Sequence, residues 1–307
     1  MRVVDNFSSG RLAYLAPHIT AHQVELLQAD LLEPGVAEKS VSGVRTVFHL
    51  AADHGGRGYV DLHQSACATN LTLDGMLFRA CRSVGVVTVV YASSGCVYPN
   101  FRQNSPDEVL YLSEDMVGPP YDADNMYGWA KLMGEMSLQA FVREGGMKGA
   151  SCRYFTVYGE RGKEDHAVIA MIARAFVKEN PFEVWGSGNQ IRNWTHVSDI
   201  VDGTMLAAER IDDGSALNLG TMERTRVIDA AREVLRYTGY EADIRLRPDM
   251  PTGPLNRVAD NTLARRLLGW QPKVRFIEGL HRTIDWYFAS KTRTEVKDRL
   301  AVALTER

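Results

Sequence analysis

The sequence of 307 residues predicts an α/β protein whose core is a doubly wound parallel sheet. Short runs of β-branched and apolar residues alternate along the chain with stretches in which apolar residues recur at helical spacing. The composition is that of an ordinary folded chain, with 45% hydrophobic and 24% charged residues. Disordered, collagen-like and coiled-coil architectures are therefore excluded. The length allows about two domains, or one large domain with an appendage.

The predicted strands are compact apolar runs. A strand ends at residues 2–5, and further strands are expected at residues 44–50, 86–92 and 150–154. Strands that alternate with helices are typical of parallel pairing. Gly55, Gly56 and Gly58 follow the second of these strands, but no helical pattern opens from them.

The predicted helices carry apolar residues three or four positions apart. Two long helices are expected at residues 70–84 and 125–141, and Gly145-Gly146 stops the second. The other expected helices span residues 167–177, 227–237, 263–268 and 276–289. The charged tail, residues 291–307, is expected to form an exposed helix.

Charge and cysteine content restrict the partners and the compartment. The net charge of −3 lacks the basic excess of a nucleic-acid binder. No run of 18 apolar residues and no signal-peptide pattern is present, so no membrane association is expected. The histidines show no metal-ligand spacing, so no metal site is expected. The unpaired spacing of the four cysteines, Cys67, Cys81, Cys96 and Cys152, suggests reduced thiols and a cytoplasmic protein.

Tyr127 and Lys131 form the strongest local motif. At positions i and i+4 they lie on one face of the predicted helix, where a lysine cation favours the phenolate form of tyrosine. The plainer interpretation is an ordinary surface pair. Ser94 follows a buried strand, at the edge where open α/β sheets bind ligands, and could hold a sugar hydroxyl. A serine at this position is otherwise a turn former.

Asp5 ends the first predicted strand and precedes the turn Ser8-Ser9-Gly10. This pattern is typical of the second strand of a dinucleotide-binding unit, where the carboxylate binds the adenosine ribose and disfavours a 2′-phosphate. NAD is therefore expected rather than NADP. In such a unit a glycine-rich turn lies about 20 residues earlier, and the sequence contains none there. Alternatively, Asp5 caps a turn.

Nine segments between Val3 and Tyr287 together resemble the extended short-chain dehydrogenase/reductase family, which includes the NAD-dependent epimerases and dehydratases. They are VVDNFSSG, FHLAADHGGRGY, YASSGCVYPNF, MYGWAK, RYFTVYGERG, VWGSGNQIRNWTHVSD, NRVADN, LGWQP and EGLHRTIDWY. AADHGGRGY and SSGCVYPNF resemble the GDP-mannose 3,5-epimerase subgroup within it.

The resemblance implies a Rossmann-type sheet in an NAD-binding domain, residues 1–155. A smaller substrate-binding domain follows in residues 156–307, and some of its segments return to the first domain. It also implies a first strand and a glycine-rich loop before Arg2, which the sequence lacks.

The resemblance further implies a nucleotide-sugar epimerase that acts through a transient 4-ketone with inversion at C3, C5 or both. Tyr127, with Lys131 and Ser94, would remove a sugar hydroxyl proton while hydride passes to NAD. Cys96, two residues beyond Ser94 on the same side of an extended strand, matches the family's catalytic cysteine, although most free cysteines are packing residues. His166 occupies the place of the family's lysine acid, with Lys163 as its rival; both could be solvated loop charges. The alternatives are a 4-epimerase or a non-catalytic nucleotide-sugar-binding relative.

The remaining expected contacts follow from the same resemblance. The sugar would lie beside Gly55, Gly56, Arg57 and Thr156, and the nucleotide diphosphate would contact Arg174, Gln190, Arg192 and Arg257. Trp185 would line the base pocket or pack in the core. NAD would contact Asp5, Asn6, Asp30, Leu31, Leu50, Ala51 and Asn70, together with Tyr127 and Lys131. A homodimer is expected, since the helix over residues 126–141 carries more apolar surface than one sheet face needs.

Overall fold

A four-stranded parallel sheet forms the centre of one lobe of the protein in the computed structural model, which describes residues 1–305 and the side chains of residues 1–300. Its strands lie in the order β10 (Ala216–Leu219), β5 (Lys148–Tyr154), β4 (Thr88–Ser94) and β3 (Thr46–His49), and all neighbours are parallel. Every residue of β4 is buried, because this strand is central and both of its faces are covered. The predicted parallel α/β architecture is confirmed.

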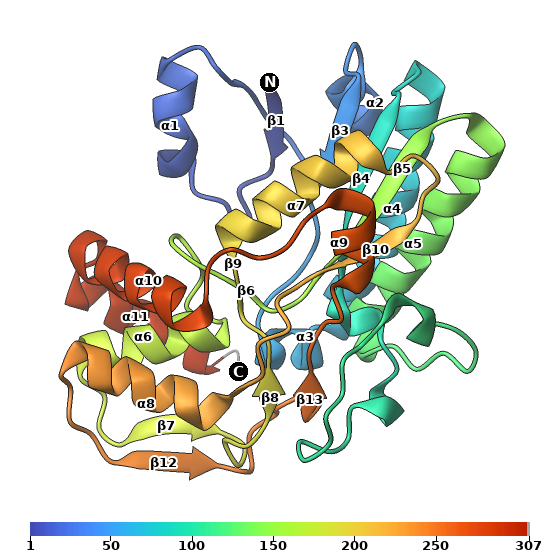
Figure 1. The fold of residues 1–307 in the computed structure, drawn as a ribbon. Coiled ribbons are helices and arrows are strands. Elements are labelled where there is room, and N and C mark those ends of the chain that lie inside the picture. The colour runs from blue at the N-terminus through green and yellow to red at the C-terminus, as the bar shows by residue number, and fades with distance from the viewer. Residues whose placement is uncertain (306–307) are drawn as a thin grey trace.

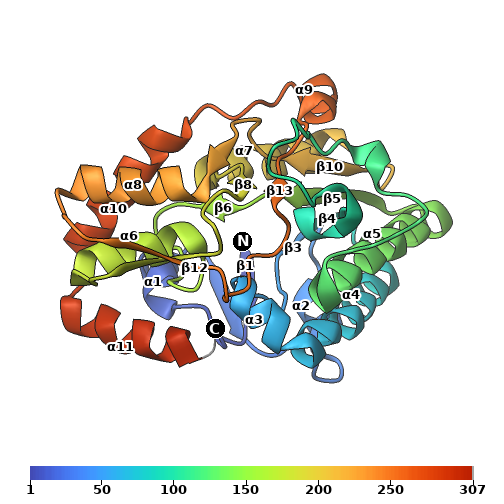
Figure 2. The same ribbon diagram turned by 90° about the horizontal axis from the view of Figure 1, so that it is seen from below.

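Helices cover both faces of this sheet (Figure 2). One face carries α2 (Val36–Val41), α4 (Gln64–Val84) and α5 (Asn125–Gly145), and the other carries α7 (Val197–Arg210) and α9 (Thr262–Leu268). Successive side chains of β4 alternate between the two cores: Val89 and Tyr91 pack toward α4, whereas Val90 packs toward α7. The strands therefore read as continuous apolar runs, as in other sheets buried on both faces.

The N-terminal strands form a separate piece of sheet. β1 (Arg2–Asp5) pairs in parallel with β2 (Glu25–Gln28), and α1 (Leu12–Thr20), which buries none of its residues, connects them. Within residues 1–305, neither strand is hydrogen-bonded to the four-stranded sheet, and Figure 1 shows β1 standing apart from β3. The parallel sheet is thus divided into two parts. Leu50, which follows β3 at the edge of the larger part, is 58% exposed.

The second lobe has its own apolar core, built from the helices α6 (Ala167–Val177), α8 (Val227–Thr238), α10 (Phe276–Ser290) and α11 (Arg293–Thr305). Three small sheets border it: β7 (Phe182–Trp185) with β12 (Ile244–Arg247); β8 (Ile191–Arg192) between β11 (Thr225–Arg226) and β13 (Asn256–Arg257); and β6 (Val157–Tyr158) with β9 (Thr195–His196). Three later elements, α7, β10 and α9, return to the first lobe.

Two expectations about local structure were wrong. A short helix, α3 (Arg57–Leu62), does open directly after Gly56. The tail helix α11 is not simply exposed, because Val296 and Leu300 are buried in the core against α6; residues 306–307 lie outside the described part. No helix within residues 1–305 is both long enough and apolar enough to cross a membrane.

Candidate functional site

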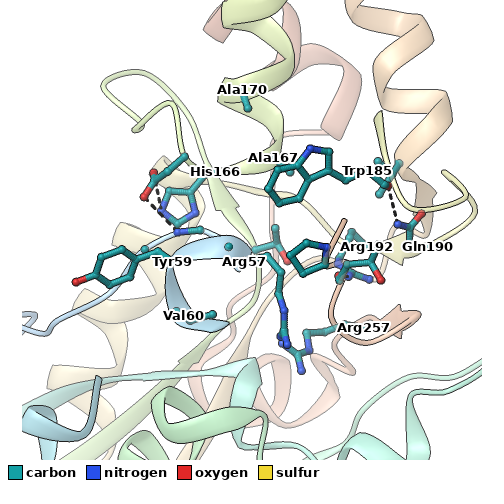
Figure 3. Close-up of a pocket in the computed structure, with 18 of the residues that line it drawn as sticks. Arg57, Tyr59, Val60, His166, Ala167, Ala170, Trp185, Gln190, Arg192 and Arg257 are labelled. Atoms are coloured by element: carbon teal, nitrogen blue, oxygen red, sulfur yellow. Dashed lines mark hydrogen bonds and ion pairs between the residues drawn. The ribbon is translucent and has the colours of Figure 1, made fainter. Parts of the chain in front are cut away.

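A cavity of about 290 Å³ lies between the two lobes. The first lobe contributes Gly55, Gly56, Arg57, Cys96, Asp124 and Tyr127 to its lining, and the second contributes Thr156, His166, Arg174, Trp185, Gln190, Arg192 and Arg257. Figure 3 shows Trp185 beside Arg192 and Gln190, with the side chains of Arg57 and Arg257 approaching each other. The structure therefore brings all eight predicted sugar-nucleotide contacts into one cavity, together with three of the five predicted catalytic residues.

Tyr127 and Lys131 lie in the first turns of α5, which begins after Asp124. Lys131 is 2% exposed, and its Nζ lies 5.9 Å from the ring centroid of Tyr127 and 4.7 Å from that of Tyr91. Burial raises the pKa of Tyr127, and Cys96 raises it further, whereas a hydrogen bond with Ser94 acts in the opposite direction. The Lys131 ammonium lies closer to the ring of Tyr91 than to that of Tyr127.

Cys96 lies in a short 3₁₀ turn, Gly95–Val97, directly after β4. The strand ends at Ser94, whose Oγ accepts a hydrogen bond from the Cys96 N–H at 3.1 Å, so strand alternation does not place the cysteine as expected. The turn nevertheless leaves the thiol facing the cavity, and Arg257 Nη1 donates to its Sγ at 3.1 Å. The sulfur is therefore held beside a guanidinium donor from the second lobe.

Asp124 joins two arginines across the cavity, a role that sequence reasoning missed. Its Oδ2 lies 2.8 Å from Arg57 Nη1 and 3.0 Å from Arg257 Nη2. Burial would raise the pKa of Asp124, but Arg257 and Arg57 together lower it. The signal that could have found it is its place immediately before the helix of the Tyr127 motif.

Arg192 carries the unbalanced positive charge of this cluster. Asp61 and Asp124 balance Arg57 and Arg257, whereas Arg192 donates only to the carbonyl oxygens of Ile191 and Thr252, both at 2.8 Å. No carboxylate in the described part of the chain forms an ion pair with it. Burial lowers the pKa of Arg192 to about 9, and Arg257 and Arg57 lower it further. This electrostatic environment favours an anionic ligand.

Arg174 and Gln190 are held by neighbouring groups. Arg174 lies 3.1 Å from Glu179 and donates to the Glu183 carbonyl at 2.8 Å, and burial lowers its pKa. Gln190 Nε2 donates to the Trp185 carbonyl at 2.9 Å (Figure 3), and its Oε1 has no hydrogen-bond partner within the described residues. The amide oxygen is thus an unused acceptor beside the cavity.

His166 precedes α6 and faces the first lobe. Its Nε2 lies 3.8 Å from Asp165 Oδ1, and the other carboxylate oxygen of Asp165 accepts the Gly56 N–H at 3.2 Å. The ring of His54 lies 6.3 Å from that of His166. Desolvation lowers the pKa of His54, with further lowering by Lys163, His166 and Lys131, although its side chain remains exposed to solvent. His166 lines the cavity, whereas Lys163 is not among its lining residues.

Six of the expected cofactor contacts lie at or just after the carboxyl ends of β1, β2 and β3: Asp5, Asn6, Asp30, Leu31, Leu50 and Ala51. Asp5 accepts the Phe7 N–H at 2.7 Å, and Asn6 donates to Asp30 at 3.1 Å, so the turns after β1 and β2 are linked. Asn70 exchanges hydrogen bonds with the backbone of Asp53, at 2.7 and 2.9 Å, and fixes the loop after β3. The expected residues Leu31 and Ala51 are partly buried in this region.

If a dinucleotide binds here, the partly exposed Asp5 carboxylate would accept hydrogen bonds from ribose hydroxyls and the exposed Leu50 would offer an apolar contact. Within residues 1–305, no glycine-rich turn followed by a helix lies between β1 and β3, where a pyrophosphate would be held. The described residues contain no group of three or more histidine, cysteine, aspartate or glutamate side chains that could hold a metal ion.

Comparisons of the sequence and of the structure with known proteins both find nucleotide-sugar epimerases. The profile of the NAD dependent epimerase/dehydratase family matches residues 2–220. GDP-mannose 3,5-epimerase 1 of Oryza sativa subsp. japonica is 32% identical over 253 residues, and GDP-mannose 3,5-epimerase of Arabidopsis thaliana is 31% identical. Each alignment covers 81% of this chain but only 66% of the plant protein. The structure of UDP-glucose 4-epimerase from Thermotoga maritima, solved with UDP-glucose, is similar with a TM-score of 0.82 and 28% identity, covering 93% of this chain and 89% of that one.

Proposed function

Because the chain belongs to the NAD dependent epimerase/dehydratase family, we propose that it is an NAD-dependent epimerase of a nucleotide diphosphate sugar. The reaction would pass through a transient 4-ketone and invert C3, C5 or both. The observation that carries this proposal is the convergence of Tyr127, Cys96 and His166 on one cavity that also contains the unbalanced charge of Arg192. The similarity to the plant GDP-mannose 3,5-epimerases supports the choice of reaction.

The binding end of the cavity suits a diphosphate. Arg192 would contact phosphate oxygens, and Gln190 and Trp185 would lie beside the nucleoside. Arginine forms paired hydrogen bonds with phosphate, and the low-dielectric surroundings strengthen them. Gly55 and Gly56 leave room for the sugar beside Arg57.

The chemical end of the cavity suits proton transfer. Bound NAD would supply the acceptor of a hydride from the sugar and would later return it. Tyr127, with Ser94, would take the hydroxyl proton and give it back. The ketone makes the adjacent C–H bonds acidic, so Cys96 would remove a proton there while His166, from the other lobe, delivers one to the opposite face.

The test is incubation of the protein and NAD with GDP-mannose or UDP-glucose in D₂O, followed by NMR. Deuterium at C3 or C5 supports the proposal, and Cys96→Ser should abolish it. Inversion at C4 without deuterium would instead favour a 4-epimerase, a second candidate supported by the similarity to the Thermotoga maritima enzyme. Binding of the sugar nucleotide without turnover by any route would identify a non-catalytic binding protein.

A further inference from the structure

The buried ammonium of Lys131 has no hydrogen bond or ion pair among the described residues. It is held instead over aromatic rings, with Nζ 4.7 Å from the ring centroid of Tyr91 and 5.9 Å from that of Tyr127. A cation over an aromatic face is attracted by the ring, but this attraction does not neutralise its charge. A buried charge requires a compensating charge nearby.

Asp74 is held at the hydroxyl end of the Tyr91 ring. It lies on α4 and is 2% exposed. Tyr91 Oη donates to its Oδ2 at 2.6 Å, and His49 Nε2 lies 2.8 Å from its Oδ1. The absence of a side chain at Gly134 lets α5 approach, since a Cβ there would lie 2.7 Å from Asp74 Oδ2. The same Tyr91 therefore contacts the cation with its ring and the carboxylate with its hydroxyl.

Glu135, the other carboxylate near Lys131, is already committed. It forms a two-pronged ion pair with Arg153, at 2.9 Å from Nε and 2.8 Å from Nη2, and also accepts the hydroxyl of Ser93. These three hydrogen bonds from two residues use its charge and most of its acceptor capacity. Asp74 is left as the uncommitted negative charge.

His49 donates a hydrogen bond to one carboxylate oxygen of Asp74, and the hydroxyl of Tyr91 donates to the other. A carboxylate can only accept, so His49 Nε2 carries the hydrogen that points to Asp74. His49 Nδ1 is buried and has no partner among the described residues. His49 and Tyr91 thus hold the two carboxylate oxygens of Asp74 in place.

We propose that Asp74 is the positioning residue of Lys131. Its negative charge, held in place by Tyr91 and His49, balances the ammonium and keeps it near Tyr127. The importance of this arrangement for turnover rests on the proposed function, whereas the charge pairing itself does not.

The electrostatics of the surrounding groups agree with this assignment. The groups facing Lys131 are Asp74 from α4, Tyr91 from β4, Tyr127 and Glu135 from α5, and His54 from the loop after β3. Burial lowers the pKa of Lys131, and Asp74 followed by Glu135 opposes this effect. Removing the charge of Asp74 should therefore make Lys131 lose its proton at lower pH.

The test is an NMR titration of protein labelled with ¹³C at lysine Cε, with the Lys131 signal assigned by its loss in Lys131→Met. In Asp74→Asn the midpoint should fall by about one pH unit or more, the effect of losing a nearby opposite charge. The matched control His49→Gln keeps a donor to Asp74 and should leave the midpoint unchanged. An unchanged midpoint in Asp74→Asn, or a shift of that size in His49→Gln, would overturn the proposal. The titration requires neither substrate nor cofactor. If the Lys131 midpoint shifts as expected but the protein shows no turnover, only the proposed function is rejected.

A stability measurement covers the case in which Asp74→Asn fails to fold. Lys131→Met leaves Asp74 as an unbalanced buried charge, so adding Asp74→Asn to it should raise the urea midpoint. If the double variant instead unfolds at lower urea than Lys131→Met alone, Asp74 does not balance Lys131.

Discussion

Gly128 is the position where a single methyl group should most directly disturb the proposed catalytic residues. It lies in α5 between Tyr127 and Lys131, against the turn that carries Cys96. A Cβ at this position would overlap the carbonyl oxygen of Cys96 and lie 3.1 Å from its carbonyl carbon. That carbonyl also accepts the Asp124 N–H at 2.8 Å, so it cannot simply rotate away. In Gly128→Ala, either α5 or the turn must move.

The size of the effect follows from two opposing terms. Overpacking of a close contact costs about 1–3 kcal/mol, whereas alanine in place of glycine inside a helix contributes about 0.5–1 kcal/mol of stability. We therefore expect Gly128→Ala to lower the free energy of unfolding by up to about 2.5 kcal/mol. A misplacement of about 1 Å can cost about 100-fold in rate, so activity should fall further than stability.

The assay is urea unfolding followed by circular dichroism, with Gly75→Ala as the matched control. Gly75 lies on the neighbouring helix α4, and a Cβ there meets nothing within 4 Å, so this variant should be more stable by about 0.5–1 kcal/mol. If both variants are stabilised equally, the close approach of α5 to Cys96 does not exist in solution and the reasoning is refuted.

Three further predictions concern binding, pH and assembly. Arg192→Gln should weaken binding of a nucleoside diphosphate by about 10- to 100-fold in calorimetry, the value of a hydrogen bond to a charged group, and an unchanged affinity would remove Arg192 from the phosphate site. The pKa of His54 is lowered by desolvation and then by Lys163, although its side chain is exposed, so the unfolded chain binds its proton first. Stability should therefore fall modestly as the pH drops below about 6.5, and His54→Gln should reduce that loss in urea titrations at several pH values. Trp129 and Met133 of α5 are 38% and 45% exposed, so light scattering should give the mass of a dimer, and Met133→Glu should give a monomer.

Much of the fold follows from local patterns in the sequence. The helix predicted at residues 167–177 is present with the same bounds as α6, because its apolar residues are dense and it packs in the core of the second lobe. The helix predicted at residues 70–84 begins earlier, at Gln64, since its first turns carry mixed polar residues without periodicity. The short helix α3 was missed because glycines precede it and its side chains give no helical pattern.

The site was less predictable, because its contacts join distant parts of the chain. The spacing of Tyr127 and Lys131 predicts a shared helix face, yet nothing local shows that Tyr91 takes the ammonium. Arg257 was expected to contact phosphate, and its hydrogen bond to Cys96 spans 161 positions. Such contacts depend on how the two lobes pack, which sequence periodicity does not record.

The first turns of α5 lie between two groups of charged residues, one facing the cavity and one on the opposite side of the helix. On the cavity side, the carboxylate of Asp124 holds Arg57 and Arg257, and its backbone N–H holds the carbonyl of Cys96. On the opposite side, Lys131 faces the anionic layer of Asp74 and Glu135. A shift of this helix would therefore alter two things at once: the contact between Arg257 and Cys96, and the position of Lys131 relative to Asp74. Gly128 lets the helix approach the carbonyl of Cys96, and Gly134 lets it approach Asp74. Because the helix packs closely on both sides, a movement on one side would also be felt on the other.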